Sequence, residues 1–368
     1  MKLFRNITDK LGVINKYRIN QVLVIALFWT IIDTGVYLYK FYRDHINLAP
    51  QPFDLHSSVV LLLRSVLIFL ICLVMAYLLT YQLKHIVRNL PLWVSLGFKS
   101  IVLVGSAFLL NFVLYFTYIW LIEKEPITTE LGRNYYRAFQ ASLFLSQMVR
   151  WLITFLVTIL FIEVNEKYSP GVFWDILLGR YLNPKNERRT IMFIDLIDST
   201  ATAEQLGHKK YFRFIRDFIY FISLALLEND GQIYQYVGDE VVVSWVVKKA
   251  NANKKCLQAL QDCKRILQRN KNYFKRQYGV VPEFRAGIHT GAVTIGEIGV
   301  IKKDLAMSGD TMNTAARLRS ATSELNQKVI ISKDFASQSN LKNWEVINLG
   351  MVDLKGKESA MELYALKI

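Results

Sequence analysis

The stretch RTIMFIDL, residues 189–196, reads as a buried β-strand that carries an acidic residue, Asp195, near its end. Its run of apolar and β-branched residues is typical of a buried strand. Two further runs, residues 231–237 and 240–247, predict a strand pair that turns at Gly238 and Asp239. Asp195 and Asp239 therefore each stand where a predicted buried strand meets a turn of the chain.

Helical and strand patterns alternate around these strands. The sequence predicts a long amphipathic helix at 208–229, a lysine-rich helix at 253–278 and further strands at 283–288 and 292–295. This alternation predicts an α+β sandwich in which helices cover one face of a mostly antiparallel sheet.

The residues before this domain are strongly apolar. The chain of 368 residues is 52% hydrophobic, and four of its segments approach the roughly 20 apolar residues that cross a bilayer. These segments lie at 21–39, 59–79, 101–121 and 141–162. The sequence thus predicts a four-helix transmembrane bundle at 1–163, a cytoplasmic linker or transducing segment at 164–188 and a soluble domain at 189–368.

Basic residues indicate how this bundle lies in the lipid bilayer. The N-terminal flank and the second predicted loop hold more basic than acidic residues, namely Lys2, Arg5, Lys10, Lys16, Arg18, Lys84, Arg88 and Lys99. Short loops rich in Lys and Arg stay on the cytoplasmic side. We therefore expect a multi-pass protein of the cell (inner) membrane with both termini in the cytoplasm.

Two charged residues, Asp33 and Arg64, fall inside the first two predicted spans at similar depth. A charge in the hydrocarbon region is costly and usually faces the interior of a bundle. The sequence leaves two interpretations open. The two residues form a structural pair that fixes how the spans pack, or they belong to a ligand or signal site.

The two strand-end carboxylates, Asp195 and Asp239, predict a metal site. Carboxylates on neighbouring strands can hold two Mg²⁺ or Mn²⁺ ions, which clamp the attacking and leaving oxygens in phosphoryl chemistry. Between Asp195 and the next helix lies a short segment, Ile197, Asp198, Ser199 and Thr200, whose backbone N–H groups at a helix N-terminus suit a triphosphate. Each aspartate taken alone also fits a turn or cap residue.

A third group of candidates lies in GDTMNTAARL, residues 309–318. Asn313 and Arg317 are four residues apart and share one helix face. An amide can orient a sugar ring, and a guanidinium can stabilise charge that develops on phosphorus. Lys355 can reach a phosphate as a point charge. Such residues also occur on ordinary helix surfaces.

Four motifs together, FIDLIDST, IYQYVGDEVVVSW, RAGIHTGAV and GDTMNTAARL, resemble the catalytic domain of class III nucleotidyl cyclases. The resemblance implies a ferredoxin-like α+β fold and a head-to-tail homodimer with two sites at its interface. It implies that Asp195 and Asp239 bind the two metal ions, Asn313 orients the ribose, Arg317 stabilises the transition state and Lys355 contacts a phosphate. The overall layout is similar to that of bacterial membrane-anchored adenylate cyclases, which convert ATP to 3′,5′-cyclic AMP and pyrophosphate.

The sequence departs from the family pattern at the two positions that select the base. The lysine that pairs with adenine in the family is Gln235 here, and its usual Asp or Thr partner is Ala306. A glutamine amide both donates and accepts hydrogen bonds, so it can pair with adenine or with another base. The resemblance therefore favours ATP, and leaves cyclic GMP or a cyclic pyrimidine nucleotide as alternative products.

The net charge of +15 is consistent with a triphosphate substrate and anionic lipid. No DNA- or RNA-binding module occurs, so we expect no nucleic-acid partner. A membrane receptor whose cyclase-like domain only dimerises or binds nucleotide remains a different class of function. Such a degenerate domain usually loses one of the motif residues, and none of Asp195, Asp239, Asn313 and Arg317 is lost here.

Overall fold

A computed structural model of the chain forms two compact units, one of Asn15–Lys167 and one of Met1–Ile14 with Tyr168–Ile368. The structure describes residues 13–45, 55–82, 91, 94–95, 97–102, 104–105, 108–109, 112, 142–166, 175–176, 178–247, 252–301, 304–357 and 359–368. Each unit is described by itself below.

The first unit is helical. Its long elements are α2 (Val13–His45), α3 (Leu55–Tyr77) with the π-helical turn η1 (Leu78–Gln82), and α7 (Ser142–Glu166). Trp29 of α2 lies at the centre of their apolar core and is 1% exposed. Its ring packs against Trp151 and Phe155 of α7, and its indole N–H donates to the hydroxyl of Thr158 at 2.8 Å. This bond satisfies the one polar atom of a buried indole.

One helix among the described residues is long and apolar enough to cross a membrane, at Arg18–Tyr39 within α2. Two further apolar helices are shorter: Ser65–Tyr81, which runs from α3 into η1, and Val149–Ile162 within α7. Three of the four predicted spans thus coincide with apolar helices, but a four-helix transmembrane bundle is not established. Most of the third predicted span, 101–121, lies outside the described residues.

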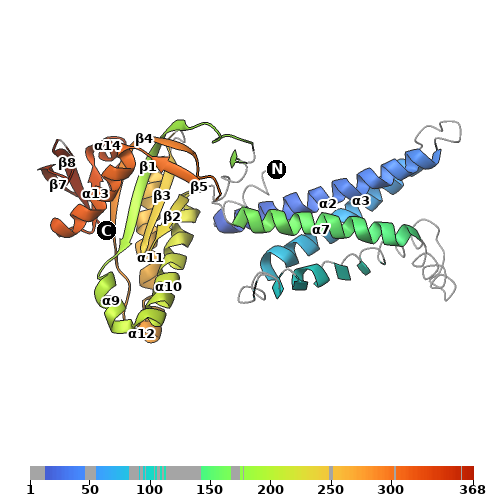
Figure 1. The fold of residues 1–368 in the computed structure, drawn as a ribbon, viewed down its shortest axis with the longest axis horizontal. Helices are drawn as coiled ribbons and strands as arrows, with labels where there is room; N and C mark the ends of the chain where they lie inside the picture. The colour runs from blue at the N-terminus through green and yellow to red at the C-terminus, as the bar shows by residue number, and fades with distance from the viewer. Residues whose placement is uncertain are drawn as a thin grey trace. The chain divides into compact units, whose positions relative to one another are not determined.

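The second unit contains one mixed sheet of eight strands (Figure 1). The strands are β1 (Lys185–Leu196), β2 (Gln232–Val237), β3 (Glu240–Val246), β4 (Phe284–Ile298), β5 (Asp304–Ser308), β6 (Val329–Ser332), β7 (Glu345–Val352) and β8 (Met361–Lys367). They follow the order β2-β3-β1-β4-β6-β8-β7, and β5 pairs with β4. Among the described strands only β4 and β6 pair in parallel, so the expected mostly antiparallel sheet is confirmed.

Helices cover both faces of this sheet, and the expectation that they cover only one face is wrong. The helices α10 (His208–Glu228), α11 (Ala252–Arg269) and α12 (Lys271–Tyr278) share one core with alternate residues of β1, β3 and β4. The helix α13 (Asp310–Glu324) packs on the opposite face, as Figure 1 shows. Gly287 of β4 permits this, because a Cβ there would lie 2.2 Å from the backbone nitrogen of Arg319.

The structure divides one predicted helix into two and joins two predicted strands into one. The lysine-rich helix predicted at 253–278 is two helices, separated at Asn270, whose amide side chain donates to the carbonyl of Ile266. Such a local bond competes with helix continuation. The strands predicted at 283–288 and 292–295 form one strand, β4, because β1 pairs with it without interruption from Lys185 to Leu196.

Two short helices complete the unit. The helix α9 (Ser199–Leu206) precedes α10, and Gly207, with a φ of 70°, separates the two. The helix α14 (Lys333–Ala336) follows β6 and is capped by the hydroxyl of Ser332. Because α9 follows directly on β1, the segment 197–200 lies at the start of α9.

The segment before β1 is fixed onto the sheet. The Tyr181 ring is 2% exposed and belongs to the core beneath α13. The backbone carbonyl of Tyr181 accepts a hydrogen bond from Glu297 of β4 at 3.2 Å. Pro184 packs against Gly296, where a Cβ would lie 3.3 Å from the Cα and Cγ atoms of Pro184. The described part of the predicted linker therefore belongs to the second unit.

Candidate active site

Asp195 lies near the C-terminal end of β1 and is 7% exposed. Arg285, its partner across the strand pair, donates from Nε to the Oδ2 atom of Asp195 at 3.0 Å. Arg319 of α13 brings its Nη1 atom to 3.5 Å from the same oxygen. Burial raises the pKa of Asp195, the charge of Asp239 adds to this shift, and both arginines oppose it.

Asp239 stands in the turn between β2 and β3, beside Gly238, whose φ of 64° requires the left-handed region. Ile194 and Val241 are partners across β1 and β3, so this turn lies level with Asp195. The Oδ2 atom of Asp239 is buried and has no hydrogen-bond partner among the described residues. A buried carboxylate oxygen without a donor is costly unless a cation occupies the place of the donor.

Glu240 and Tyr211 also border this pair of aspartates, and sequence reasoning missed both. Glu240 forms an ion pair with Arg319 at 2.7 Å. Burial raises the pKa of Glu240, and the charges of Asp195 and Asp239 add to the shift while Arg319 opposes it. Burial also raises the pKa of the Tyr211 phenol, and Asp239 adds to it. The smaller contributions to these pKa shifts show that the charges of Asp195 and Asp239 act on Glu240 and Tyr211.

The residues at this end of the sheet fit a divalent cation. No group of three or more His, Cys, Asp and Glu side chains with metal-site geometry occurs within the described ranges. However, Mg²⁺ typically takes one or two carboxylates and completes its shell with water and substrate phosphates. The carboxylates of Asp195 and Asp239, with the unpartnered Oδ2 of Asp239, match that donor set.

The segment 197–200 forms the start of α9. Asp198 is the N-cap residue and adopts the left-handed conformation with a φ of 53°, and no side chain caps this helix end. The N–H group of Ile197 donates to the carbonyl of Glu283 at 2.9 Å, so it is not available to a ligand. The backbone groups of Ser199 and Thr200 in the first turn remain suited to a phosphate.

Asn313 and Arg317 lie on α13, Asn313 exposed and Arg317 half-buried. A Cβ on Gly356 would lie 3.1 Å from Nη2 of Arg317, so this guanidinium lies against the turn that carries Lys355. Lys355, the residue before Gly356 in this turn, is exposed.

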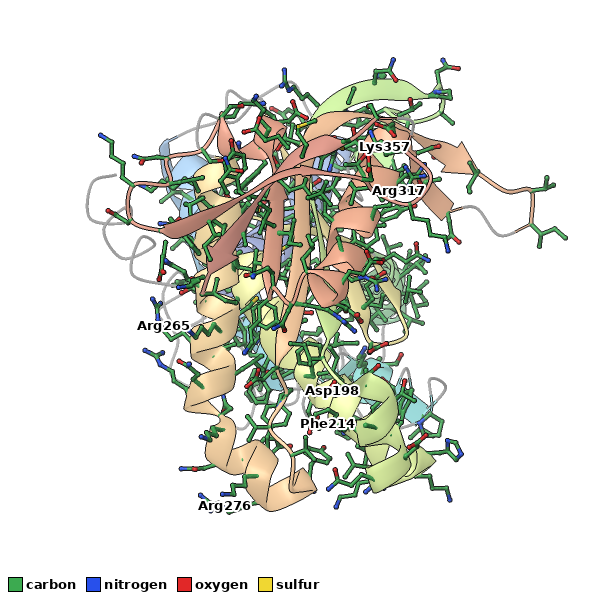
Figure 2. All side chains as sticks on the ribbon, turned by 90° about the vertical axis from the view of Figure 1, so that its left-hand side faces the viewer. Asp198, Phe214, Arg265, Arg276, Arg317 and Lys357 are labelled. Atoms are coloured by element: carbon green, nitrogen blue, oxygen red, sulfur yellow. The ribbon has the colours of Figure 1, made fainter. Side chains whose placement is uncertain are left out.

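Lys357, which the sequence analysis did not single out, binds the same helix. Its Nζ atom lies 2.8 Å from Oδ2 of Asp310, and this hydrogen bond lowers the pKa of Asp310. Figure 2 shows Lys357 beside Arg317, while Asp198 lies well apart from both of them. The turn after β7 is therefore tied to the N-terminus of α13 by an ion pair.

The two predicted base-selecting positions lie on strands that contact each other. Gln235 is exposed on β2, next to an irregularity in the pairing with β3, and Ala306 of β5 pairs with Gly296. The backbone N–H of Met307 donates to the hydroxyl of Tyr234 at 3.1 Å. This bond joins the two strands one residue away from each predicted position.

Comparison with known proteins agrees with the motifs. Residues 183–368, half of the chain, match the family described as adenylate and guanylate cyclase catalytic domain. Adenylate cyclase 2 of Rhizobium meliloti (strain 1021) is 35% identical over 173 residues, which cover 47% of this chain and 48% of that protein. Guanylate cyclase 2D of Rattus norvegicus is 24% identical over 198 residues, which cover 53% of this chain and 18% of that protein.

A solved structure of a bacterial light-regulated adenylyl cyclase is similar in fold, with a TM-score of 0.53 and 19% sequence identity over 62% of this chain and 66% of that one. The chain spans less than half the length of the two curated relatives. From the family match, the resemblance that the four motifs indicated is confirmed: this chain belongs to the adenylate and guanylate cyclase catalytic domain family.

Proposed function

We propose that this chain is a membrane-anchored adenylate cyclase that converts ATP to 3′,5′-cyclic AMP and pyrophosphate. The observation that carries the proposal is the pair of aspartates in this cyclase-family domain. The charge of Asp239 acts on Asp195, and one buried carboxylate oxygen of Asp239 accepts no hydrogen bond from the described residues. This is the environment that a cation bridging to a triphosphate requires.

In the proposed reaction the ribose 3′-hydroxyl loses its proton to water and its oxygen forms a bond to the α-phosphorus, while the bond from that phosphorus to the pyrophosphate oxygen breaks. Two Mg²⁺ or Mn²⁺ ions, when bound at Asp195 and Asp239, would supply Lewis acidity to the attacking oxygen and to the phosphates. Asn313 orients the ribose, and Arg317 stabilises the charge that develops on the α-phosphate. Lys355 and the first turn of α9 hold the remaining phosphates.

The site is proposed to form between two copies of the chain. Successive residues of an α-helix differ by about 100° around its axis, so Arg317 and Arg319 project in nearly opposite directions, about 160° apart. Arg319 reaches Asp195 of its own chain. Arg317 therefore points away from its own metal carboxylates, which supports a homodimer in which Asn313 and Arg317 act on the partner's site.

ATP is the proposed substrate because the 35% identical relative is an adenylate cyclase. Gln235 can pair with the adenine edge, and Ala306 leaves the second predicted base-selecting position without a polar group. The neutral amide offers a weaker hydrogen bond than a lysine ammonium would, so we expect a modest preference over other bases. GTP is the second candidate, since Gln235 also fits a guanine edge and guanylate cyclases are among the relatives.

The membrane anchor is proposed to be a four-helix domain in the inner membrane, with both termini in the cytoplasm. The apolar segments of α2, α3 and α7 and their shared core around Trp29 support it. The hydroxyls of Thr34 and Ser65 lie 3.2 Å apart, so α2 and α3 meet one residue beyond Asp33 and Arg64. This contact supports the predicted pair between Asp33, which is 6% exposed, and Arg64.

The test is an assay of the purified full chain in detergent with Mn²⁺ and each nucleoside triphosphate in turn, with products identified by mass. We expect cyclic AMP as the main product and no product from Asp195→Asn or Arg317→Ala. Arg265→Gln, on the exposed side of α11, is the control that removes a positive charge away from these residues. A product profile dominated by a cyclic pyrimidine nucleotide, or no cyclic product from a folded dimer, would contradict the proposal.

A further inference from the structure

Arg319 is fixed in place by the contact between α13 and the sheet. Its backbone nitrogen and Cα atom would lie 2.2 and 2.8 Å from a Cβ on Gly287, so the helix backbone rests directly on β4 at this residue. The position of the Arg319 Cα is therefore set by the packing of α13, and its side chain has to extend from there toward the ends of β1 and β3.

The guanidinium of Arg319 joins two carboxylates that border the proposed metal site. Nη2 lies 2.7 Å from Oε2 of Glu240, and Nη1 lies 3.5 Å from Oδ2 of Asp195. Its Nε atom is buried and has no hydrogen-bond partner among the described residues. The Arg319 guanidinium is thus held by ion pairs at Nη1 and Nη2, while its Nε atom is shielded from solvent.

Charges in this group are nearly balanced. Asp195, Asp239 and Glu240 contribute three carboxylates, and Arg285 and Arg319 contribute two guanidinium groups, which leaves one formal negative charge. Both arginines meet the same oxygen of Asp195, Oδ2, so neither contact uses Oδ1. Arg319 is thus both a support for Asp195 and a positive charge that an entering cation would meet.

We propose that Arg319 is a positioning residue that sets the divalent-cation affinity of this site. It holds Asp195 and Glu240 in place before a cation binds, and its charge weakens binding compared with the same carboxylates alone. This inference rests on the proposed function, because it takes Asp195 and Asp239 as the cation ligands. Its consequence is that the site stays largely empty at low cation concentration and fills when the cation arrives with a triphosphate.

The test measures Mn²⁺ binding to the full chain in detergent by electron paramagnetic resonance, with Mn²⁺ as the only added ligand. We expect Arg319→Gln to tighten Mn²⁺ binding about tenfold. This is the size of the repulsion between a unit positive charge and a divalent cation a few ångströms away when water screens most of the interaction. Arg265→Gln removes one positive charge at an exposed site on α11 and is expected to leave the affinity unchanged.

A second pair of variants separates charge from damage to the fold. Glu240→Gln removes a negative charge and is expected to weaken Mn²⁺ binding about tenfold. Glu240→Gln with Arg319→Gln restores the net charge and is expected to return the affinity to within about threefold of wild type. This comparison decides the question even if Arg319→Gln alone does not fold, because the double variant removes both members of the ion pair between Arg319 and Glu240.

The outcomes distinguish this inference from the proposed function. If wild type does not bind Mn²⁺, or Asp239→Asn binds it as well as wild type does, the proposed metal site is wrong and the inference fails with it. If Asp239→Asn weakens binding, but removing Arg319 leaves the affinity unchanged or lower in both backgrounds, only the inference is overturned.

Discussion

Replacing Gly287 by alanine tests whether the packing of α13 on β4 sets the geometry of the site. The added Cβ would lie 2.2 Å from the nitrogen of Arg319, 2.6 Å from the carbonyl oxygen of Ala315 and 2.8 Å from the Cα of Arg319. All three contacts are with helix backbone, so no side-chain rotation relieves them. Gly287 is not among the residues with a positive φ, so the effect is one of contact and not of backbone strain.

The size of the effect follows from these distances. To open the closest contact from 2.2 Å to 3.0 Å, the shortest spacing that real Cβ atoms adopt, α13 has to move by about 0.8 Å. Overpacking of this kind costs about 1–3 kcal/mol, and the lower entropy of an unfolded alanine returns about 0.4–1 kcal/mol. We expect a net loss of about 1–2 kcal/mol, which lowers the Tm of a domain of this size by about 2–8 °C.

Activity is expected to fall further than stability. The same movement displaces Asn313, which is proposed to orient the ribose, and Arg317, which is proposed to stabilise charge in the transition state. A misplacement of about 1 Å can cost about 10²-fold in rate. We therefore expect kcat to drop by about two orders of magnitude, with a smaller change in KM. Steady-state kinetics with ATP and Mn²⁺ and thermal unfolding by circular dichroism measure the two effects.

Gly296→Ala is the matched control. A Cβ there would meet atoms of Pro184 at 3.3 Å, a distance that small adjustments relieve. We expect it to change both Tm and kcat little. If Gly287→Ala keeps the wild-type Tm and kcat, the close contact of α13 with β4 does not constrain the site, and the reasoning from these distances is refuted.

Three further predictions concern the dimer, the membrane domain and pH. Mixing inactive Asp195→Ala and Arg317→Ala chains is expected to restore up to about half of the wild-type activity per heterodimer, because one of its two sites carries neither defect; an inactive mixture of chains that co-assemble would require a self-contained site in each chain. Asp33→Asn and Arg64→Gln are each expected to destabilise the membrane domain by about 3 kcal/mol or more in detergent unfolding, and together by clearly less than the sum; a double variant as damaging as the sum would disprove the pair. Burial lowers the pKa of His289 below its ordinary value of 6.5, so the unfolded chain binds a proton at a higher pH than the folded chain does, and stability falls as the pH drops below about 6.5. The fall in Tm with decreasing pH is expected to be shallower in His289→Gln than in wild type, and an unchanged slope would contradict this role of His289.

The sequence predicts the two aspartates at the strand ends of this site, but it does not predict the side chains that contact them. Asp195 and Asp239 follow from local patterns, an apolar run and a turn, and the structure brings their charges together as expected. The contacts of Arg285 and Arg319 with Asp195 depend on residues 90 or more positions away, and no local pattern reports them. A sequence alone therefore identifies the proposed ligands and misses the charges that balance them.

The packing of α13 is a second case in which local patterns are insufficient. The sequence predicts two strands here, 283–288 and 292–295, with Gly287 inside the first and Gly291 in the gap between them. In the structure both glycines lie inside β4 and face α13: Gly287 meets its backbone, and Gly291 meets the side chain of Thr311. Whether a glycine ends a strand or admits a neighbour depends on tertiary contacts, so this placement required the structure.

The attachment of Tyr181 and Pro184 to β4 has a practical consequence for trimming the chain to a soluble fragment. A fragment that begins at 189, where the sequence places the domain boundary, would lose the first four residues of β1 and the Tyr181 ring from the core beneath α13. It would also uncover Gly296 and leave the N–H of Glu297 without its acceptor. A fragment that begins upstream of Asp175 keeps Tyr181 and Pro184 against β4, and it retains the ion pair between Asp175 and Arg180.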